Sequence, residues 1–347
     1  MNKNISKTSI CIGRFQPIHN GHIHLLRQAT EKCDLLIVVL GSGDRPGDIN
    51  NPFSDSNRIG MISSVIHTDE VLKDRDCSIQ FIAVHDYMYS DTKWIQELRS
   101  KVSPMIEGEV TLYGHRKDSS SYYLDLFPDW GLEEVEEGID GLSATSIREK
   151  FFKYKQIPEN AIPIAVERYI LHWFDSHAFR NLRAEYNLVS KQKKAWSKAP
   201  YPAPFVTADS IVIHKGRVLM IKRAAHPGKG LMALPGGYMD LAEDKDMMAT
   251  ALRELEEETQ LVLKRKECKN YDDNAIIFAS KRRSVRGRII TGAFLWVLED
   301  DVDVDNQIIG SDDAEEAFWV PLEDLARKSH IIFEDHLEII TKMVGMI

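Results

Sequence analysis

Two histidines that follow a glycine turn near the amino terminus are candidate catalytic residues. His19 and His22 lie three residues apart in the segment GRFQPIHNGH at positions 13–22. A helix is predicted to begin there directly after a strand, so both imidazoles can face one point beyond the strand's end, where open parallel sheets bind ligands. The helix start adds free N–H groups and a positive dipole end. The arrangement predicts stabilisation of charge on a transferring phosphate group; the alternative is that the histidines merely cap the helix.

Three glutamates form a second cluster. Glu254, Glu257 and Glu258 occupy positions i, i+3 and i+4 of a predicted helix, so their carboxylates project from one face. Such crowding is repulsive unless cations bind, and oxygen ligands of this kind suit Mg²⁺ or Mn²⁺. Bound metals could bridge a diphosphate and activate a water. The cluster therefore predicts metal-dependent hydrolysis of a phosphoanhydride, and the alternative is a solvated acidic helix face.

The first half of the chain alternates short apolar runs with helical patterns. Strands are predicted at 9–12, 34–40, 78–84 and 109–113, and helices at 21–33, 92–102, 144–154 and 164–174. The run at 34–40 is continuously apolar, as in a parallel strand buried on both faces. The alternation predicts βαβ units and an α/β fold with a Rossmann-like parallel sheet.

The length of the chain, 347 residues, exceeds what one hydrophobic core usually organises, so two domains are expected. The first is predicted at 1–178 and the second at 207–347. Between them, residues 179–206 are polar and basic and then rich in proline, and they are predicted to form a linker. The second domain has alternating strands, a glycine-rich loop, a long acidic helix and a terminal helix, which is an α+β order.

The amino-acid composition indicates which kinds of ligand and which cell compartment to expect. A net charge of -9 opposes non-specific binding to nucleic acid and favours small phosphorylated ligands. The four cysteines show no C-x-x-C spacing, which fits a reducing compartment. The amino terminus lacks the apolar stretch of a signal peptide or membrane span. A cytoplasmic protein without a nucleic-acid or membrane partner is expected, while an oligomer stays possible.

The histidine segment resembles the H-x-G-H signature of the nucleotidyltransferase superfamily. The longer string G-R-F-Q-P-x-H-x-G-H is similar to that of the archaeal-type nicotinamide mononucleotide adenylyltransferases. The resemblance returns in Gly41-Ser-Gly43, in Asn51-Pro-Phe53 with Arg58 downstream, and in the segment SATSIR at 143–148. It covers about the first half of the chain.

This resemblance implies in-line attack by the phosphate of nicotinamide mononucleotide on the α-phosphorus of ATP, which gives NAD and expels pyrophosphate with the help of Mg²⁺. His19, His22, Arg14 and Arg148 would stabilise the charge. The implied substrate-binding residues are Gly13, Phe15, Gly41, Asn51, Trp94, Ser143, Thr145 and Ser146. Trp94 would stack on nicotinamide, or else be an ordinary core aromatic. Taken alone, the serine-rich helix start at 143 could be an N-cap.

The glutamate cluster resembles the Nudix box, G-x5-E-x7-R-E-U-x-E-E-x-G-U. The fitting residues are Gly237, Glu243, Arg253, Glu254, Leu255, Glu257, Glu258 and Leu261. Two departures matter, because nine residues instead of seven separate Glu243 from Arg253, and Gln260 replaces the usual glycine. The loop before the helix must therefore differ, or Glu243 does not reach its usual place.

An archaeal-type adenylyltransferase followed by this Nudix type is similar to bacterial bifunctional proteins whose second domain cleaves ADP-ribose to AMP and ribose 5-phosphate. Arg283, Arg286 and Arg288 could then hold the diphosphate or the terminal ribose, or be surface arginines. Glu315 or Glu316 could supply a further catalytic carboxylate.

Two rival functions stay open. The first domain could transfer a nucleotidyl group to another phosphate acceptor, such as phosphopantetheine or a flavin precursor. The second could sense ADP-ribose without cleaving it, as related Nudix regulators of transcription do. Such regulators need an attached DNA-binding module, and no basic recognition-helix segment follows Ile331, so hydrolysis is favoured.

Overall fold

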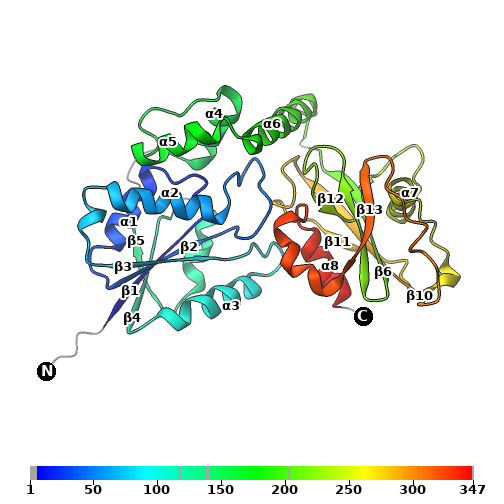
Figure 1. The fold of residues 1–347 in the computed structure, drawn as a ribbon, viewed down its shortest axis with the longest axis horizontal. Coiled ribbons are helices and arrows are strands. Elements are labelled where there is room, and N and C mark those ends of the chain that lie inside the picture. Colours follow the sequence, from blue (N-terminus) through cyan, green and yellow to red (C-terminus); the bar gives the residue numbers. More distant parts are fainter. Residues whose placement is uncertain (1–5, 117–118, 137–140, 202, 346–347) are drawn as a thin grey trace. The chain divides into compact units, whose positions relative to one another are not determined.

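The computed structural model describes residues 6–116, 119–136, 141–201 and 203–345, which fall into two compact units, Met1–Arg183 and Ala184–Ile347 (Figure 1). Each unit has its own sheet and its own apolar core. In the part of the chain that the structure describes, no helix is both long and apolar enough to cross a membrane.

The first unit is built on a five-stranded sheet in the order β3-β2-β1-β4-β5. Its strands are β1 (Lys7–Gly13), β2 (Leu35–Leu40), β3 (Ser78–Ala83), β4 (Glu109–Gly114) and β5 (Gly131–Glu134). Every pairing is parallel, which confirms the predicted α/β sheet. The carboxyl ends of all five strands therefore lie along one edge, and the loops that follow them meet there.

Helices accompany this sheet (Figure 1). They are α1 (Asn20–Ala29), α2 (Asp55–Thr68), α3 (Asp91–Val102), α4 (Ala144–Tyr154) and α5 (Ile164–Trp173), with 3₁₀ turns at Leu72–Asp74, Ser103–Met105 and Ser119–Leu126. The central strands are buried on both faces because their residues are nearly all apolar; Ile10, Ile37 and Val39 belong to one core cluster. The edge strand β5 is exposed throughout.

Most of the segment expected to be a linker is a helix, α6 (His177–Trp196). Among its charged residues, Phe179, Leu182 and Val189 are buried, so an apolar stripe at helical spacing stabilises it. The two units divide inside this helix, between Arg183 and Ala184. The proline-rich stretch begins only after the helix has ended.

The second unit holds an eight-stranded mixed sheet. Its strands are β6 (Phe205–His214), β7 (Arg217–Arg223), β8 (Met232–Ala233), β9 (Gly236–Tyr238), β10 (Cys268–Tyr271), β11 (Ile276–Phe278), β12 (Ile289–Leu298) and β13 (Ala314–Pro321), and its helices are α7 (Met247–Thr259) and α8 (His336–Val344), with 3₁₀ turns at Arg265–Glu267, Leu322–Asp324 and Ala326–Ile331. β6 and β12 pair in parallel, whereas β7 and β13 are antiparallel. Ala251 and Leu255 of α7 pack with Trp296 in the core, so the acidic face of α7 is turned away from the apolar one. This confirms the predicted α+β order.

Candidate functional site

The loop that joins β1 to α1 is held by its own side chains. Phe15 has a left-handed backbone (φ 50°), and its ring packs against that of His22, with 4.8 Å between centroids. A Cβ atom on Gly13 would lie 3.0 Å from the Phe15 ring, so a side chain at this position would press on that ring. Gln16 exchanges two hydrogen bonds with the backbone of Phe53, at 2.8 and 2.9 Å, which pins the loop to the segment before α2.

The two histidines lie together at the start of α1, as predicted. His19 is the N-cap residue, and its ring stacks on that of His22 with 3.7 Å between centroids. Nδ1 of His22 accepts a hydrogen bond from the backbone N–H of His19 at 3.2 Å, so the hydrogen of the neutral ring lies on Nε2. Burial and the neighbouring His19 hold the pKa of His22 well below its usual value. His22 is therefore a neutral donor at physiological pH, and the histidines both cap the helix and stand at the carboxyl edge of the sheet.

Arg58 on α2 ties the loops at this edge together. It is fully buried and donates to the backbone carbonyls of Arg14, Gly41 and Ser42 at 2.7, 2.6 and 3.2 Å. Asp55 accepts a further hydrogen bond from it at 2.6 Å. The loops after β1 and β2 are thus held by one buried cation, Arg58. The side chain of Arg14, by contrast, is exposed.

The start of α4 is a capped helix terminus. Ser143 is the N-cap, and its hydroxyl accepts from the backbone N–H of Ser146 at 3.2 Å. The N-cap alternative is therefore realised for Ser143. Thr145 and Ser146 are exposed in the first turn, where free N–H groups also lie.

Arg148 brings this helix start to the histidine loop. It is buried, and its Nη1 donates to the carbonyl of Gln16 at 2.7 Å although 132 residues separate the two in sequence. Its Nη2 donates to the hydroxyl of Thr145 at 3.2 Å. Burial, followed by the nearby charge of Arg14, lowers the pKa of Arg148 to about 10. The guanidinium still carries its charge at neutral pH, so two cations accompany the histidines at this edge.

Asn51 and Trp94 were also predicted to bind substrate. Asn51 is buried, its Nδ2 lies 3.3 Å from Asp48, and its Oδ1 has no hydrogen-bond partner among the described residues. An unpaired buried acceptor is costly, which suits a group that receives a donor from a ligand. Trp94 on α3 packs against the apolar core with its ring centroid 6.0 Å from that of Phe127. The core-aromatic alternative is realised for Trp94, and its stacking on nicotinamide stays a prediction.

Sequence reasoning missed an ionic cluster after β3. Nδ1 of His85 lies 2.8 Å from Glu97, and its Nε2 lies 3.5 Å from Asp44. Lys101 contacts Glu97 at 2.7 Å. The hydrogen bond with Glu97 is the main cause that raises the pKa of His85, and the pKa of Glu97 falls to about 2. The available signal was a polar run directly after a predicted parallel strand, which is where such a sheet places ligand-contacting groups.

In the second unit, Glu258 is buried on α7. Its Oε2 accepts from the backbone N–H of Gly236 at 2.9 Å. Burial is the main cause that raises its pKa to about 8, and the neighbouring Glu254 adds to the rise; burial also raises the pKa of Glu254. A divalent cation would relieve this crowding of desolvated oxygen donors, so the donor set fits Mg²⁺ or Mn²⁺. Yet among the described residues, no group of three or more His, Cys, Asp or Glu side chains converges as a metal site.

Arg253 pairs with two of the three predicted metal-binding carboxylates. Its Nη1 donates to Glu254 and to Glu257, both at 2.8 Å. Its Nε and Nη2 donate to the two oxygens of Asp244 at 3.0 and 2.8 Å. Glu243, which fits the box pattern, is exposed, whereas Asp244 is buried and Arg253 holds its pKa below the usual range. The alternative that Glu243 does not reach its usual place is thus realised: with the longer loop, the next residue, Asp244, is the partner of Arg253.

Two backbone positions of the box are also explained. A Cβ atom on Gly237 would lie 2.5 Å from the carboxylate of Glu254, so only glycine lets this carboxylate sit against β9. Gln260 ends α7 with a left-handed backbone (φ 60°). Glycine adopts this conformation without strain, which accounts for the usual residue there.

The three arginines that were expected to hold the diphosphate or the terminal ribose differ in the partners that they already have. Arg283 is buried and makes two hydrogen bonds of 3.0 Å to Asp335, so the expectation that it holds a diphosphate is wrong, because its guanidinium is already neutralised. Arg286 donates to Glu334 at 3.2 Å and lines a cavity of about 640 Å³ together with the exposed Arg288.

Glu315 and Glu316 are exposed at the start of β13, and both lie near Lys222, at 3.3 and 3.5 Å. A catalytic role for either one stays a prediction.

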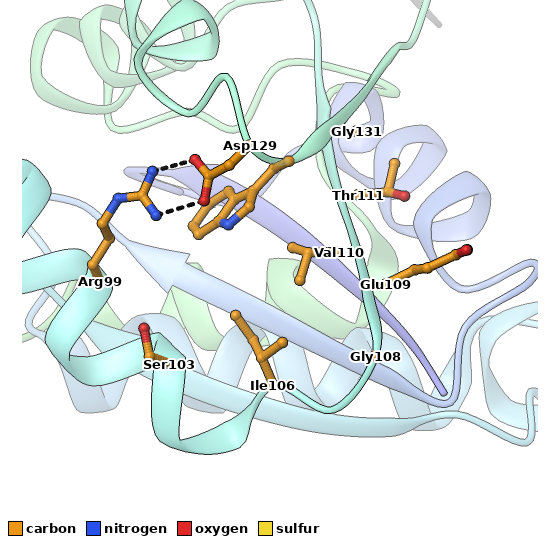
Figure 2. A pocket seen from close by; sticks show the side chains of 10 residues that line it. Arg99, Ser103, Ile106, Gly108, Glu109, Val110, Thr111, Asp129 and Gly131 are labelled. Atoms are coloured by element: carbon orange, nitrogen blue, oxygen red, sulfur yellow. Dashed lines mark hydrogen bonds and ion pairs between the residues drawn. The ribbon is translucent and has the colours of Figure 1, made fainter. Parts of the chain in front are cut away.

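The first unit has a cavity of about 570 Å³ away from the histidines (Figure 2). Its lining residues Glu109, Val110 and Gly131 begin β4 and β5, so it lies at the amino ends of the strands. Arg99 and Asp129 face each other across it and form an ion pair. Because Asp129 already neutralises Arg99, the residues that line this cavity do not indicate a phosphate-binding site.

Comparisons with known proteins agree with both clusters. Residues 10–150 match the cytidylyltransferase-like family, and residues 204–341 match the NUDIX domain. A nicotinamide/nicotinic acid mononucleotide adenylyltransferase of Acinetobacter baylyi is 34% identical over 179 residues, which are 51% of this chain and 92% of that protein. The ADPR responsive transcriptional repressor NtrR of the same organism is 29% identical over 160 residues, which are 45% of this chain and 60% of that protein.

One group of solved structures is similar along the whole chain. The crystal structure of a bifunctional NMN adenylyltransferase/ADP ribose pyrophosphatase from Francisella tularensis, complexed with AMP and a Mn ion, is 32% identical, covers 99% of both chains and has a TM-score of 0.89. A second structure of that protein has a TM-score of 0.90. With both units, their order and both clusters accounted for, the chain belongs to the family of bifunctional NMN adenylyltransferase/ADP-ribose pyrophosphatases.

Proposed function

We propose that the first unit transfers AMP from ATP to nicotinamide mononucleotide, giving NAD and pyrophosphate, and that the second unit hydrolyses ADP-ribose to AMP and ribose 5-phosphate. The observation that carries this proposal is the likeness to the Francisella tularensis protein across 99% of the chain, which includes both units. The histidine cluster at α1 is suited to the transfer reaction, and the glutamate cluster at α7 is suited to the hydrolysis.

In the first reaction, a phosphate oxygen of the mononucleotide forms a bond to the α-phosphorus of ATP while the bond to pyrophosphate breaks. No covalent intermediate with the protein is needed. The neutral His22 offers its Nε2–H to a phosphoryl oxygen, and His19 stands beside it. Arg14 and Arg148 bring positive charge, which lowers the energy of the transition state without any proton transfer. When bound, Mg²⁺ would shield the charge of the leaving pyrophosphate.

In the second reaction, a water attacks phosphorus and the diphosphate bond breaks. Glu254, Glu257 and Glu258 are the residues that would hold Mg²⁺, with Mn²⁺ as an alternative. The bound cation supplies charge neutralisation and a lowered pKa of the attacking water. Arg253 holds the carboxylates of Glu254 and Glu257 on one side of α7. Arg288 is exposed on the cavity wall, where it can meet the anionic substrate, whereas Arg286 on the same wall is paired with Glu334 and Arg283 is paired with Asp335.

The test is a pair of assays on the full-length protein. ATP with nicotinamide mononucleotide should release pyrophosphate and form NAD, and nicotinic acid mononucleotide as second acceptor measures the preference between amide and acid. ADP-ribose with Mg²⁺ should yield AMP. Absence of pyrophosphate release with both acceptors would remove the first half of the proposal, and unchanged ADP-ribose would remove the second.

A second candidate function for the Nudix unit is binding of ADP-ribose without cleavage. The likeness to the ADPR responsive repressor NtrR supports it, as does the engagement of Glu254 and Glu257 by Arg253. The two functions separate in one experiment, because a sensor binds ADP-ribose and releases no AMP when Mg²⁺ is added.

A further inference from the structure

Two of the four cysteines lie at the amino ends of neighbouring strands in the first unit. Cys33 comes two residues before β2, and Cys77 comes directly before β3. β2 and β3 pair in parallel with Leu35 opposite Ser78, and the backbone N–H of Ser78 donates to the carbonyl of Asp34 at 2.9 Å. The strand pairing therefore brings together two cysteines that are far apart in the sequence.

The side chains of these two cysteines are in contact. The thiol of Cys77 donates a hydrogen bond to the sulfur of Cys33, and the carbonyl of Ser78, 3.6 Å away, is its other acceptor. Residues on neighbouring strands that are one position out of register have Cα atoms about 6 Å apart. Disulfides form over Cα separations of about 4.4–6.8 Å, so this pair can be bridged without a large movement of the backbone.

The surroundings of Cys33 favour its thiolate. The hydrogen bond from Cys77 is the main cause that lowers the pKa of Cys33, and a hydrogen bond from the buried hydroxyl of Ser9 acts in the same direction. Burial and the charge of Asp34 act against them without reversing the shift. The pKa of Cys77 is raised, mainly because its proton is held by Cys33. Since the thiolate is the nucleophile, Cys33 is the sulfur that attacks first.

The other two cysteines are in different surroundings. Cys11 is fully buried on β1, and burial raises its pKa. Cys268 begins β10 in the second unit, where burial also raises its pKa, and its Sγ lies 3.6 Å from the carbonyl of Lys264. Cys33 keeps 8% of its surface exposed and Cys77 is half-buried, so a small oxidant can reach this pair.

We propose that Cys33 and Cys77 are a redox modification site that reacts with hydrogen peroxide and closes to a disulfide. The sulfur of Cys33 attacks one peroxide oxygen, the O–O bond breaks, and the departing hydroxide takes the thiol proton, which gives a sulfenic acid and water. The sulfur of Cys77 then attacks the sulfur of Cys33, the S–O bond breaks, and a second water leaves with the proton of Cys77. The two thiols lose two electrons, which the peroxide gains.

The place of the pair in the sheet determines what the modification does. It lies at the amino ends of β2 and β3, whereas His19 and His22 lie at the carboxyl edge. The disulfide should therefore leave NAD synthesis within twofold of the reduced protein. It should stabilise the first unit, because a covalent bridge restricts the unfolded chain. The chemistry of the pair does not depend on either reaction proposed above.

The experiment treats the full-length protein with hydrogen peroxide, blocks the remaining thiols with an alkylating reagent and maps the peptides by mass spectrometry. The variants are Cys33→Ser and Cys77→Ser, with Cys268→Ser as the matched control for loss of a cysteine elsewhere. The wild type and Cys268→Ser should give a peptide pair joined through Cys33 and Cys77, which a dithiol reductant releases. In Cys77→Ser, dimedone should trap a sulfenic acid at Cys33. In the wild type, Cys33 should react with peroxide about tenfold faster than Cys268.

Thermal unfolding gives a second readout that needs no peptide map. Peroxide should raise the midpoint of the first unit by several degrees in the wild type and in Cys268→Ser. It should raise it in neither Cys33→Ser nor Cys77→Ser.

The proposal is overturned if peroxide leaves Cys33 and Cys77 of the folded wild type as open to alkylation as Cys268. It is also overturned if the joined peptide forms only in denatured protein. A sulfenic acid that forms at Cys77 in Cys33→Ser as fast as at Cys33 in Cys77→Ser contradicts the assignment of the attacking sulfur. Should Cys33→Ser fail to fold, the peptide map and the thermal shift of the wild type decide by themselves.

Discussion

The imidazole of His19 stacks on that of His22, while the hydrogen bond that orients the His22 ring comes from the backbone N–H of His19. Replacing His19 by alanine therefore removes one of the two proposed phosphate ligands and keeps the hydrogen bond that orients the other. We expect kcat for NAD synthesis to fall about 100-fold or more, as for other losses of a preorganised donor. Hydrolysis of ADP-ribose and the thermal midpoint should stay near the wild-type values.

The control for this prediction is His24→Ala, because His24 lies on the same helix and its Nε2 lies 3.1 Å from Nε2 of Gln28, away from the histidine pair. It should leave NAD synthesis within twofold of the wild type. Near-normal turnover of His19→Ala in a steady-state pyrophosphate assay would show that charge stabilisation at this edge does not depend on the histidine pair.

The neighbours Glu243 and Asp244 provide a second test at single residues. Asp244 is buried and accepts two hydrogen bonds from Arg253, whereas Glu243 is exposed. Asp244→Ala leaves the guanidinium without its main partner, and we expect a loss of about 1–3 kcal/mol in the stability of the second unit. ADP-ribose hydrolysis should fall at least tenfold, since Arg253 also positions Glu254 and Glu257. Denaturant unfolding and AMP release measure the two effects.

Glu243→Ala is the matched control, and it should change neither stability nor hydrolysis. If Glu243→Ala is the damaging variant and Asp244→Ala is silent, then the box pattern, and not the hydrogen bonding, identifies the partner of Arg253.

The strongly periodic or apolar helices and strands could be predicted from the sequence. The predicted strand at 34–40 is β2, the predicted helix at 92–102 is α3, and the acidic helix is α7. α2 was not predicted, because serines and Gly60 interrupt its sequence and its buried face includes the charged Arg58. β5 was missed because its residues are exposed and half of them are glutamates.

The assembly of the sites depends on more than these elements. The spacing of His19 and His22 predicted their contact, since both lie on one helix turn. The contact of Arg148 with Gln16 crosses 132 residues, and only the resemblance to a family placed them in one site. The ion pair that removes Arg283 from the site depends on where α8 docks, which no local pattern reveals.

The ionic cluster of His85, Glu97 and Lys101 joins the end of β3 to α3, and it predicts a pH dependence. The pKa of His85 is raised, so its contribution to stability is present below its unfolded value near 6.5 and is lost as pH rises through the higher folded value. The pKa of Glu97 is lowered to about 2, so its contribution is present above about 4.5 and is lost as pH falls toward 2. Both act together between about pH 4.5 and 6.5.

We therefore expect Glu97→Gln to lower the thermal midpoint most between pH 4.5 and 6.5, and less above pH 8. A series of melts across this range measures the difference, with the exposed Glu31→Gln as the control for loss of one surface charge. A difference between wild type and Glu97→Gln that is as large at pH 9 as at pH 5.5 would rule out His85 as the titrating partner.

At the scale of the whole molecule, two phosphate chemistries occupy two separately cored units of one chain. A net charge of -9 opposes non-specific binding to nucleic acid, and each proposed site holds cations of its own, Arg14 and Arg148 in the first unit and Arg286 and Arg288 in the second. α6 is the element that both units share. Arg183 donates to the carbonyl of Phe152 within the first unit, and Glu185 accepts from the backbone of Gly228 within the second.

This arrangement predicts the course of unfolding. Because each unit has its own core, calorimetry of the full chain should resolve two transitions instead of one two-state step. Asp244→Ala should lower one transition by several degrees and leave the other in place, and His19→Ala should shift neither. The opposite outcome is expected if the continuous helix α6 makes the two units unfold together. Asp244→Ala would then move the whole endotherm as a single peak, and the two units would have to be treated as one cooperative unit.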